Sequence, residues 1–174
     1  MGYTSYETPD DVFRAVNEEF RFDVDVCAVP DNAKCARFFT PEQNGLAQDW
    51  RGVCWCNPPF DRTKPAWVKK AYESAQAGAT VVVLLPWNGT GDTSWWHKYV
   101  LRASEIRYLR GRQRYSGLDG RKVTVRTVLV VFRPYCEGPP VALSCKDTGT
   151  LFPNTSHQPP PNGGRLDGVV GPLN

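Results

Sequence analysis

The chain has 174 residues, which is enough for one domain with a hydrophobic core and too few for two. Apolar residues make up 41% of it, and no apolar run approaches the roughly 20 residues that cross a bilayer, which argues against a membrane-spanning protein. The N-terminus lacks the basic and then apolar segments of a signal peptide, so we expect a soluble cytoplasmic protein with no membrane partner.

The net charge of +3 conceals an uneven distribution of charge along the chain. Residues 1–60 carry ten acidic and five basic side chains, whereas residues 61–136 carry five acidic and fourteen basic ones. Seven cations fall between Arg107 and Arg126, and Tyr108 and Tyr115 alternate with them. This pattern is typical of surfaces that hold phosphates and stack on bases. We expect a basic face that binds nucleic acid, although a solvated basic surface gives the same counts.

The first 60 residues predict one helix and two strands separated by a polar loop. The apolar spacing of residues 9–20 indicates an amphipathic helix, with acids in its first turn and Thr8 as a possible cap. Residues 22–28 alternate between apolar and polar side chains, as a strand does. Residues 29–50 have too few periodic apolar positions for more than a turn or two of helix. Residues 53–56 form a second, apolar strand.

The second half continues the alternation of helix and strand. Residues 65–77 are the clearest helix, with Pro65 near its start and Gly78 just past its end. Residues 80–85 are apolar and mostly β-branched, which suits a central parallel strand covered on both faces. One more helix and two strands are expected over residues 94–100, 105–109 and 123–132.

These elements predict an α/β fold with a mostly parallel sheet and helices on both faces. The last two strands should form an antiparallel hairpin on the edge of the sheet. We place this domain at residues 1–136. From residue 137 onward, 13 of 38 residues are Pro or Gly, so we expect residues 137–174 to be disordered or loosely packed.

The tetrapeptide Asn57-Pro58-Pro59-Phe60 follows the strand at 53–56 directly and carries the clearest chemistry. An amino group on a conjugated ring is a poor nucleophile because its lone pair is delocalised. The Asn57 side-chain oxygen and the Pro58 carbonyl can accept both amino hydrogens, which frees the lone pair to attack. The prolines fix φ and hold these acceptors in place, and Phe60 offers a face for an unstacked base. A turn that merely ends a strand can carry the same residues.

Two carboxylates lie near predicted strand ends, where ligands of open α/β sheets bind. Asp25 begins the segment Asp25-Val26-Cys27-Ala28 and suits an ammonium or hydroxyl group of a cofactor. Asp49 precedes the second strand and can accept a hydrogen bond from a ring amino group. Asp25 can instead be an outward-facing strand residue, and Asp49 a helix or turn cap.

The six cysteines give no sign of a metal site or of a disulfide framework. No Cys-x-x-Cys pair is present, and the chain has only two histidines, His97 and His157. Cys54 and Cys56 lie on one face of a predicted strand. We expect buried, reduced thiols and no bound metal.

Residues 6–136 resemble the phage-encoded DNA N6-adenine methyltransferases, a compact family related to the Dam-type enzymes. The resemblance rests on an ordered set of motifs: Thr8-Pro9, Asp25-Val26-Cys27-Ala28, Asn32-Ala33-Lys34-Cys35, Asp49-Trp50, Asn57-Pro58-Pro59-Phe60, Gly111-Arg112 and Arg114-Tyr115. It implies a Rossmann-like, S-adenosylmethionine-dependent enzyme that methylates adenine N6 in DNA. For a phage or prophage protein it implies the cytoplasm of a bacterial host.

The resemblance also implies roles for individual residues. It assigns catalysis to Asn57, Pro58, Pro59 and Phe60. It assigns S-adenosylmethionine to Thr8, Pro9, Asp25, Cys27, Ala28, Asn32, Asp49 and Asn57. From the charge pattern we expect DNA phosphates at Arg110, Arg112, Arg114, Arg121, Lys122 and Arg126. No glycine-rich run follows Asp25, and the group that holds the cofactor ribose is open between Asp31 and Asn32.

Other functions remain open at this point. The same tetrapeptide serves enzymes that methylate RNA adenine or glutamine amides in proteins, and a non-catalytic nucleic-acid-binding protein can keep such a fold. Asn57 argues against cytosine N4 methylation, where Ser is usual at the first position. No obligate protein partner is evident. Because the chain has little room for a separate recognition domain, we expect a short or relaxed recognition sequence.

Overall fold

The computed structural model describes residues 6–87, 91–117, 120–136 and 138–144. Its helices are α1 (Asp10–Phe20), α2 (Lys64–Gln76) and α3 (Ser94–Tyr99), with short 3-10 turns η1 (Gly45–Ala47) and η2 (Val100–Arg102). Its strands are β1 (Tyr6–Glu7), β2 (Val24–Asp25), β3 (Val53–Cys56), β4 (Thr80–Pro86), β5 (Glu105–Tyr108), β6 (Gln113–Gly117), β7 (Lys122–Val125), β8 (Thr127–Phe132) and β9 (Val141–Ser144).

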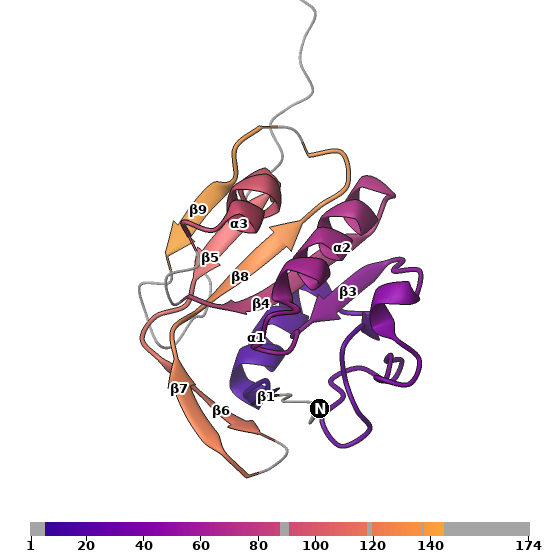
Figure 1. Ribbon diagram of the computed structural model, residues 1–174, viewed down its shortest axis with the longest axis vertical. Helices are drawn as coiled ribbons and strands as arrows, with labels where there is room; N and C mark the ends of the chain where they lie inside the picture. The colour runs from indigo at the N-terminus through magenta and orange to yellow at the C-terminus, as the bar shows by residue number, and fades with distance from the viewer. Residues whose placement is uncertain (1–5, 88–90, 118–119, 137, 145–174) are drawn as a thin grey trace, which may run out of the picture.

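The strands form two sheets (Figure 1). The main sheet has six strands in the order β2-β3-β4-β8-β5-β9, and the small sheet has three in the order β1-β6-β7. In the main sheet β2, β3 and β4 are parallel, as are β5 and β9, while β8 is antiparallel to both of its neighbours. The prediction of a mixed α/β fold with a mostly parallel sheet is confirmed.

The helices cover both faces of the main sheet, as the sequence predicted. In β4, Val81, Val83 and Leu85 pack with residues of α2 and α3. Val82 and Leu84 point to the other face and pack with residues of α1. Because both faces of β4 are buried, the strand is apolar throughout rather than alternating.

The two longest helices form where the apolar spacing placed them. Helix α1 carries Asp10 and Asp11 in its first turn, and Gly78 follows α2 with a φ of 106°. The expectation that Thr8 caps α1 is wrong. Pro9 takes the N-cap position, no side chain caps this end, and Thr8 is buried.

The predicted single strand over residues 123–132 is two strands in different sheets. β7 alternates between exposed and half-buried residues, whereas every residue of β8 is buried. The pattern of β7 therefore suits a sheet with one solvent-exposed face, and the pattern of β8 suits a strand that is buried on both faces. The chain passes from β7 to β8 at Arg126. The segment before β7, for which the sequence predicted no strand, contains β6. The β6–β7 hairpin extends away from the main sheet at the lower left of Figure 1.

The outer edge of the main sheet also differs from the prediction. β5 and β8 are antiparallel as expected, but β8 lies between β4 and β5, and β9 covers the outer edge of β5. β9 lies beyond residue 136, where the composition predicted no ordered element. Val141 is 58% exposed and pairs with Glu105 through the main chain, so its apolar side chain does not mark a buried position. Residues 145–174 of the predicted tail lie outside the described residues, and the domain boundary stays a prediction.

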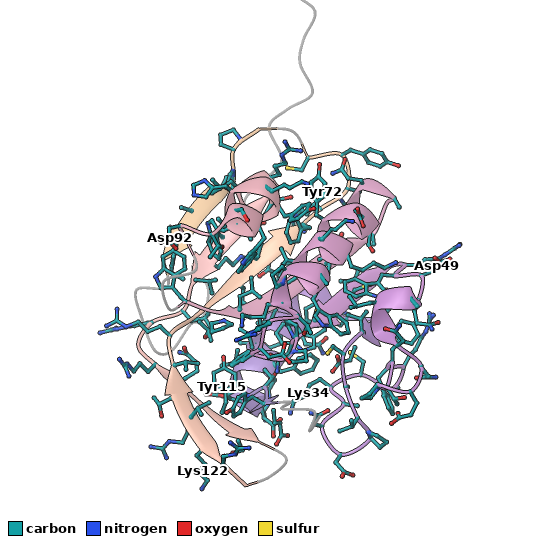
Figure 2. The ribbon with its side chains drawn as sticks, viewed as in Figure 1. Lys34, Asp49, Tyr72, Asp92, Tyr115 and Lys122 are labelled. Carbon is teal, nitrogen blue, oxygen red and sulfur yellow. The ribbon has the colours of Figure 1, made fainter. Side chains whose placement is uncertain are left out.

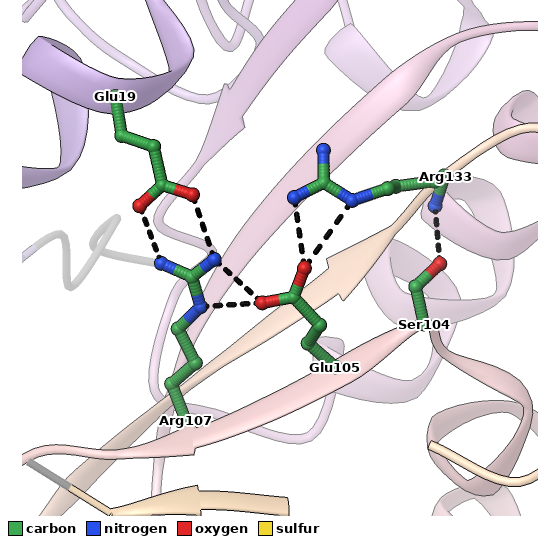
Figure 3. A network of polar contacts seen from close by, with 5 residues as sticks. All are labelled: Glu19, Ser104, Glu105, Arg107 and Arg133. Atoms are coloured by element: carbon green, nitrogen blue, oxygen red, sulfur yellow. Dashed lines mark hydrogen bonds and ion pairs between the residues drawn. The ribbon is translucent and has the colours of Figure 1, made fainter. Parts of the chain in front are cut away.

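A network of charged side chains joins the end of α1 to β5 and β8 (Figure 3). The two terminal nitrogens of Arg107 donate to Glu19 at 2.6 and 2.8 Å, and its Nε donates to Glu105 at 2.7 Å. Arg133 donates to the other oxygen of Glu105 at 2.8 Å. Burial raises the pKa of Glu105, but the two guanidinium groups outweigh it and hold that pKa below its ordinary value.

Arg107 is therefore a structural residue and not part of a phosphate-binding surface, although the charge pattern grouped it with the basic residues around it. Its side chain is almost fully buried, and its guanidinium lies 5.2 Å from the centre of the Phe20 ring. The sequence pattern did not separate this arginine from its exposed neighbours because its acidic partner Glu19 lies 88 residues away.

Replacing Arg107 should destabilise the fold. Arg107→Met leaves Glu19 and Glu105 without their main partner. We therefore expect the free energy of unfolding to fall by roughly 3 kcal/mol. This value is below the upper range for buried pairs because Glu19 is partly exposed. Urea unfolding followed by circular dichroism measures this. Arg51→Met is the matched control, because it breaks an exposed Arg–Asp pair and should cost about 0.5 kcal/mol or less. Equal losses in both variants would contradict the structural role.

Candidate active site and nucleic-acid surface

Asn57 lies directly after β3 and has one buried polar atom with no partner. Its Nδ2 donates to the main-chain oxygen of Tyr6 at 2.6 Å. Its Oδ1 is buried and accepts no hydrogen bond from the described residues. Since the Tyr6 oxygen can only accept, this contact decides which end of the amide faces β1 and leaves Oδ1 free. A buried acceptor without a donor is costly, and a donor that arrives with a ligand would satisfy it.

The rest of the tetrapeptide is a rigid turn beside an aromatic cluster. Pro58 and Pro59 are buried, and Phe60 is half-buried. The Phe60 ring lies 5.4 Å from the ring of Tyr6 and 5.4 Å from that of Tyr115, measured between centroids. These contacts fix Phe60 and leave part of its ring accessible.

Tyr115 cannot stack on a base from its present position. It is fully buried, and its hydroxyl donates to Thr127 Oγ1 at 3.1 Å. The expectation that it joins the arginines on the surface is wrong. In β6 the side chains alternate between the two faces, so Arg114 and Ser116 are exposed while Tyr115 points into the core.

Asp25 organises the loop after β2. It is only 3% exposed, and its two oxygens accept from the main-chain nitrogens of Cys27 at 3.2 Å and Lys34 at 3.1 Å. Burial raises the pKa of Asp25 to about 6, against the opposing effect of these hydrogen bonds. The alternative of an outward-facing Asp25 is therefore wrong.

The other residues that the resemblance assigns to this loop are buried with it. Cys27, Ala28 and Asn32 are each less than a tenth exposed. Asn32 Oδ1 accepts from the main-chain nitrogen of Val29 at 2.9 Å, which closes a tight turn. The loop is thus held by its own side chains, and its compact shape does not require a glycine-rich run.

Lys34 joins this loop to the segment that enters α1. Its Nζ donates to Glu7 at 3.1 Å and to Asp10 at 2.6 Å, and its side chain is 9% exposed. The sequence pattern alone assigns no role to Lys34. Two features of the sequence point to Lys34. It lies in one of the family motifs, and it is one of only five basic residues among the first 60.

A cavity opens where the segment before α1 meets β6. Its volume is about 200 Å³, and its lining combines two carboxylates, one guanidinium and two hydroxyl groups, from Glu7, Thr8, Pro9, Asp10, Arg114 and Ser116. Thr8 and Pro9, predicted to bind a cofactor, therefore lie beside Arg114, predicted to bind DNA. The main chain of β1, which leads into this cavity, also holds Asn57.

Asp49 lies apart from the other predicted site residues. Its side chain is exposed, contacts Arg51 at 3.2 Å and lines a separate cavity of about 370 Å³ together with residues near the end of α2. Because α2 leads from the end of β3 back to the start of β4, this cavity lies toward the amino-terminal ends of the parallel strands, whereas Asn57 follows the carboxyl end of β3. Figure 2 shows Asp49 at the right edge of the molecule, away from Lys122.

The six cations predicted to bind phosphates are all exposed, and they surround the β6–β7 hairpin: Arg110, Arg112, Arg114, Arg121, Lys122 and Arg126. Lys122 lies at the far end of the hairpin in Figure 2. β6 pairs with β1 through Glu7 and Ser116. Arg114 and Lys122 therefore lie in the same small sheet as β1, the segment that holds Asn57.

The sequence profile of the family described as DNA N-6-adenine-methyltransferase (Dam) matches residues 4–151. The chain belongs to this family. It is similar to the DNA N-6-adenine-methyltransferase of Haemophilus phage HP1 (strain HP1c1), with 40% identity over 107 residues that cover 60% of this chain and 61% of the relative.

Two other relatives match parts of the chain. The putative methyltransferase YfdM of Escherichia coli (strain K12) is 40% identical over 63 residues, which cover 32% of this chain and 69% of the relative. The DNA N-6-adenine-methyltransferase of Escherichia phage T1 is 30% identical over 104 residues, which cover 58% of this chain and 42% of the relative. The match thus spans less than two thirds of the HP1 protein and less than half of the T1 protein.

The described residues contain no cluster of potential metal ligands. No group of three or more His, Cys, Asp or Glu side chains there could hold a metal ion. Cys54 is buried, and this burial raises the pKa of its thiol to about 12, so it stays protonated and unreactive at neutral pH. In the same part of the chain, no helix has the length and apolar character needed to span a membrane.

The raised pKa of Asp25 predicts a pH-dependent stability difference. Folding raises this pKa from 3.8 to about 6, so the folded state binds the proton more tightly than the unfolded state. The free energy of unfolding of the wild-type protein therefore falls as pH rises through this window and the carboxylate ionises. Asp25→Asn removes the charge. Relative to wild type, its free energy of unfolding should therefore increase between pH 4 and pH 6.5.

Urea unfolding of both proteins at several pH values measures the difference. The variant loses one acceptor for the loop nitrogens, so its absolute stability can be lower at every pH. The prediction concerns only the change with pH. A difference that stays constant or moves in the opposite direction would contradict it.

Proposed function

We propose that this protein transfers a methyl group from S-adenosylmethionine to N6 of adenine in DNA. The observation that carries the proposal is the buried, unpartnered Oδ1 of Asn57, at the end of a parallel strand and beside a half-buried aromatic ring. Family membership and the names of the HP1 and T1 relatives support the same reaction.

The reaction follows from the hydrogen bonds available at the tetrapeptide. Asn57 Oδ1 and the Pro58 carbonyl accept the two hydrogens of the adenine amino group, which favours a pyramidal nitrogen with its lone pair directed at the methyl donor. Bound S-adenosylmethionine supplies an electrophilic methyl carbon on a sulfonium. Asn57 is a neutral amide and keeps no proton, so it acts by orientation. The bond from N6 to the methyl carbon would form as the methyl–sulfur bond breaks, S-adenosylhomocysteine would leave, and the proton released from the amino nitrogen would pass to solvent. The prolines hold the acceptors in position before substrate binds, so little reorganisation accompanies the reaction.

The cavity beside β1 has the chemistry to hold part of the cofactor. The amino-acid end of S-adenosylmethionine carries both an ammonium and a carboxylate. Glu7 and Asp10 each have one oxygen paired with Lys34, and their other oxygens match the ammonium. Arg114 matches the carboxylate, and the hydroxyls of Thr8 and Ser116 can complete the contacts. Asp25 has both oxygens engaged by the loop, so we propose that it shapes the cofactor loop. Asp49 faces a different cavity, and a cofactor contact there stays a prediction.

The arrangement of strands supports a Rossmann-like binding site. In β2, β3 and β4 the carboxyl ends point the same way, and the loops after β2 and β3 hold the two groups of proposed site residues. Ligands in open α/β sheets bind at this edge. The reversed β8 on the other side of β4 places the hairpin next to the same edge.

DNA is the proposed acceptor because of the cations around the β6–β7 hairpin. Adenine N6 is out of reach inside a duplex, so the base must leave the stack, at a cost of a few kcal/mol. The exposed arginines can hold phosphates on either side while the base lies against Phe60. Six cations near the site disfavour a protein amide as acceptor. RNA adenine remains the alternative, and the modified nucleoside distinguishes it.

Asn57→Ala should abolish transfer and preserve binding. The variant loses an acceptor that acts on the amino group, so the rate of methyl transfer should fall by about 100-fold or more. DNA affinity should stay close to wild type. Single-turnover assays with labelled cofactor measure the rate, and mass spectrometry of the digested product identifies the nucleoside. Retained transfer in Asn57→Ala would refute the assigned role.

Single substitutions on the hairpin should weaken DNA binding with a measurable change in salt dependence. Arg112→Gln and Arg121→Gln should each lower the slope of log affinity against log salt by about 0.9, because each loses one phosphate contact. Lys69→Gln removes the same charge from the exposed face of α2 and should leave the slope unchanged. Fluorescence anisotropy with labelled DNA over a range of salt measures this. Equal effects in all three variants would indicate a general charge effect and no hairpin site.

A further inference from the structure

We propose that Lys34 is a positioning residue for Asn57, acting through β1 and the main-chain oxygen of Tyr6. The inference rests on the proposed function, since it concerns how the acceptor of that reaction is oriented. It assigns a role to a residue that contacts neither the tetrapeptide nor the aromatic cluster. Three links carry it: Lys34 to Glu7, Glu7 to its neighbour Tyr6 in β1, and Tyr6 to Asn57.

The first link is a nearly buried cation between two carboxylates. Lys34 Nζ lies 3.1 Å from Glu7 and 2.6 Å from Asp10, while its main-chain nitrogen donates to Asp25. Burial lowers the pKa of Lys34, but hydrogen bonds and charges of its two partners outweigh this and keep it above its ordinary value. The lysine is therefore charged at neutral pH, and it ties the loop after β2 to β1 and to the start of α1.

The second link is the short strand itself. β1 has two residues and pairs with β6 on one side, Tyr6 with Gly117 and Glu7 with Ser116. Such a short ladder is weak on its own. The ion pair between Glu7 and Lys34 fixes β1 from a second direction. Without it, β1 depends on the hairpin and on the contact of the Tyr6 ring with Phe60.

The third link sets the direction of the Asn57 amide. Nδ2 donates to the Tyr6 oxygen at 2.6 Å, so Oδ1 is presented for a donor. If β1 moves away, the amide can rotate and present its NH₂ group instead. An NH₂ group cannot accept the hydrogens of the adenine amino group, so the rotated amide is inactive. Displacement of β1 should therefore lower the rate of transfer more than the affinity for DNA.

The experiment compares variants of the full chain in steady-state methyl transfer. Lys34→Met keeps an unbranched apolar side chain and removes the charge, and we expect kcat to fall about tenfold, with the KM for DNA within about twofold of wild type. Lys34→Arg keeps the charge and should restore much of kcat. Lys69→Met makes the same change at an exposed ion pair on α2 and should behave like wild type.

A second readout separates this inference from the proposed function. The side-chain amide signals of Asn57, identified by their loss in Asn57→Ala, report the hydrogen bond to Tyr6 by nuclear magnetic resonance. In Lys34→Met these signals should move toward those of a solvent-exposed amide, and their hydrogen exchange should speed up. If wild type transfers no methyl group, the proposed function fails, while this readout still tests the link from Lys34 to Asn57.

Glu7→Gln tests the link from Lys34 to Asn57 if Lys34→Met does not fold. It removes the partner of Lys34 in β1 and leaves Asp10 in place, so the Asn57 signals should shift in the same direction. Unchanged Asn57 signals in a folded variant, with kcat within about twofold of wild type, would overturn the inference. So would a loss of kcat that Lys34→Arg does not relieve, because the charge would then not be the cause.

Discussion

The hydrogen bond from Asn57 to the main-chain oxygen of Tyr6 is the contact on which the proposed site depends. It joins residues 51 positions apart and decides which end of the Asn57 amide is free. The buried oxygen left without a donor is unfavourable in the isolated protein, and a substrate amino group would satisfy it. The proposed catalytic geometry thus depends on a two-residue strand outside the main sheet.

The small sheet links this contact to the proposed DNA surface. β1 supplies the oxygen that orients Asn57, and β6 pairs with β1 and carries Arg114 into the adjoining cavity. The cations predicted to hold phosphates lie on and beside the same hairpin. The described residues therefore bring the proposed phosphate-binding surface next to the proposed catalytic loop. The main sheet, buried on both faces, holds the tetrapeptide at the end of β3 against this small sheet.

Charged residues play two different roles in the chain, and burial separates them. Arg107 and Lys34 are almost fully buried and join distant segments through carboxylates. The six cations near the hairpin are exposed to solvent. Replacing a buried member should therefore change stability or orientation, and replacing an exposed member should change affinity and its salt dependence.

Apolar periodicity by itself determined the main helices and the central strand, because the spacing of α1 and α2 and the unbroken apolar run of β4 express burial directly. The tetrapeptide and the motifs around it also determined the family. The tertiary structure decided what depends on partners distant in sequence. Pairing between remote segments produces the break at Arg126, the added strand β9, the burial of Arg107 and the proposed role of Lys34. The position of Asp49 follows from the direction of the parallel strands. Local patterns do not encode such pairing, because a main-chain hydrogen bond or an ion pair leaves no period in the sequence.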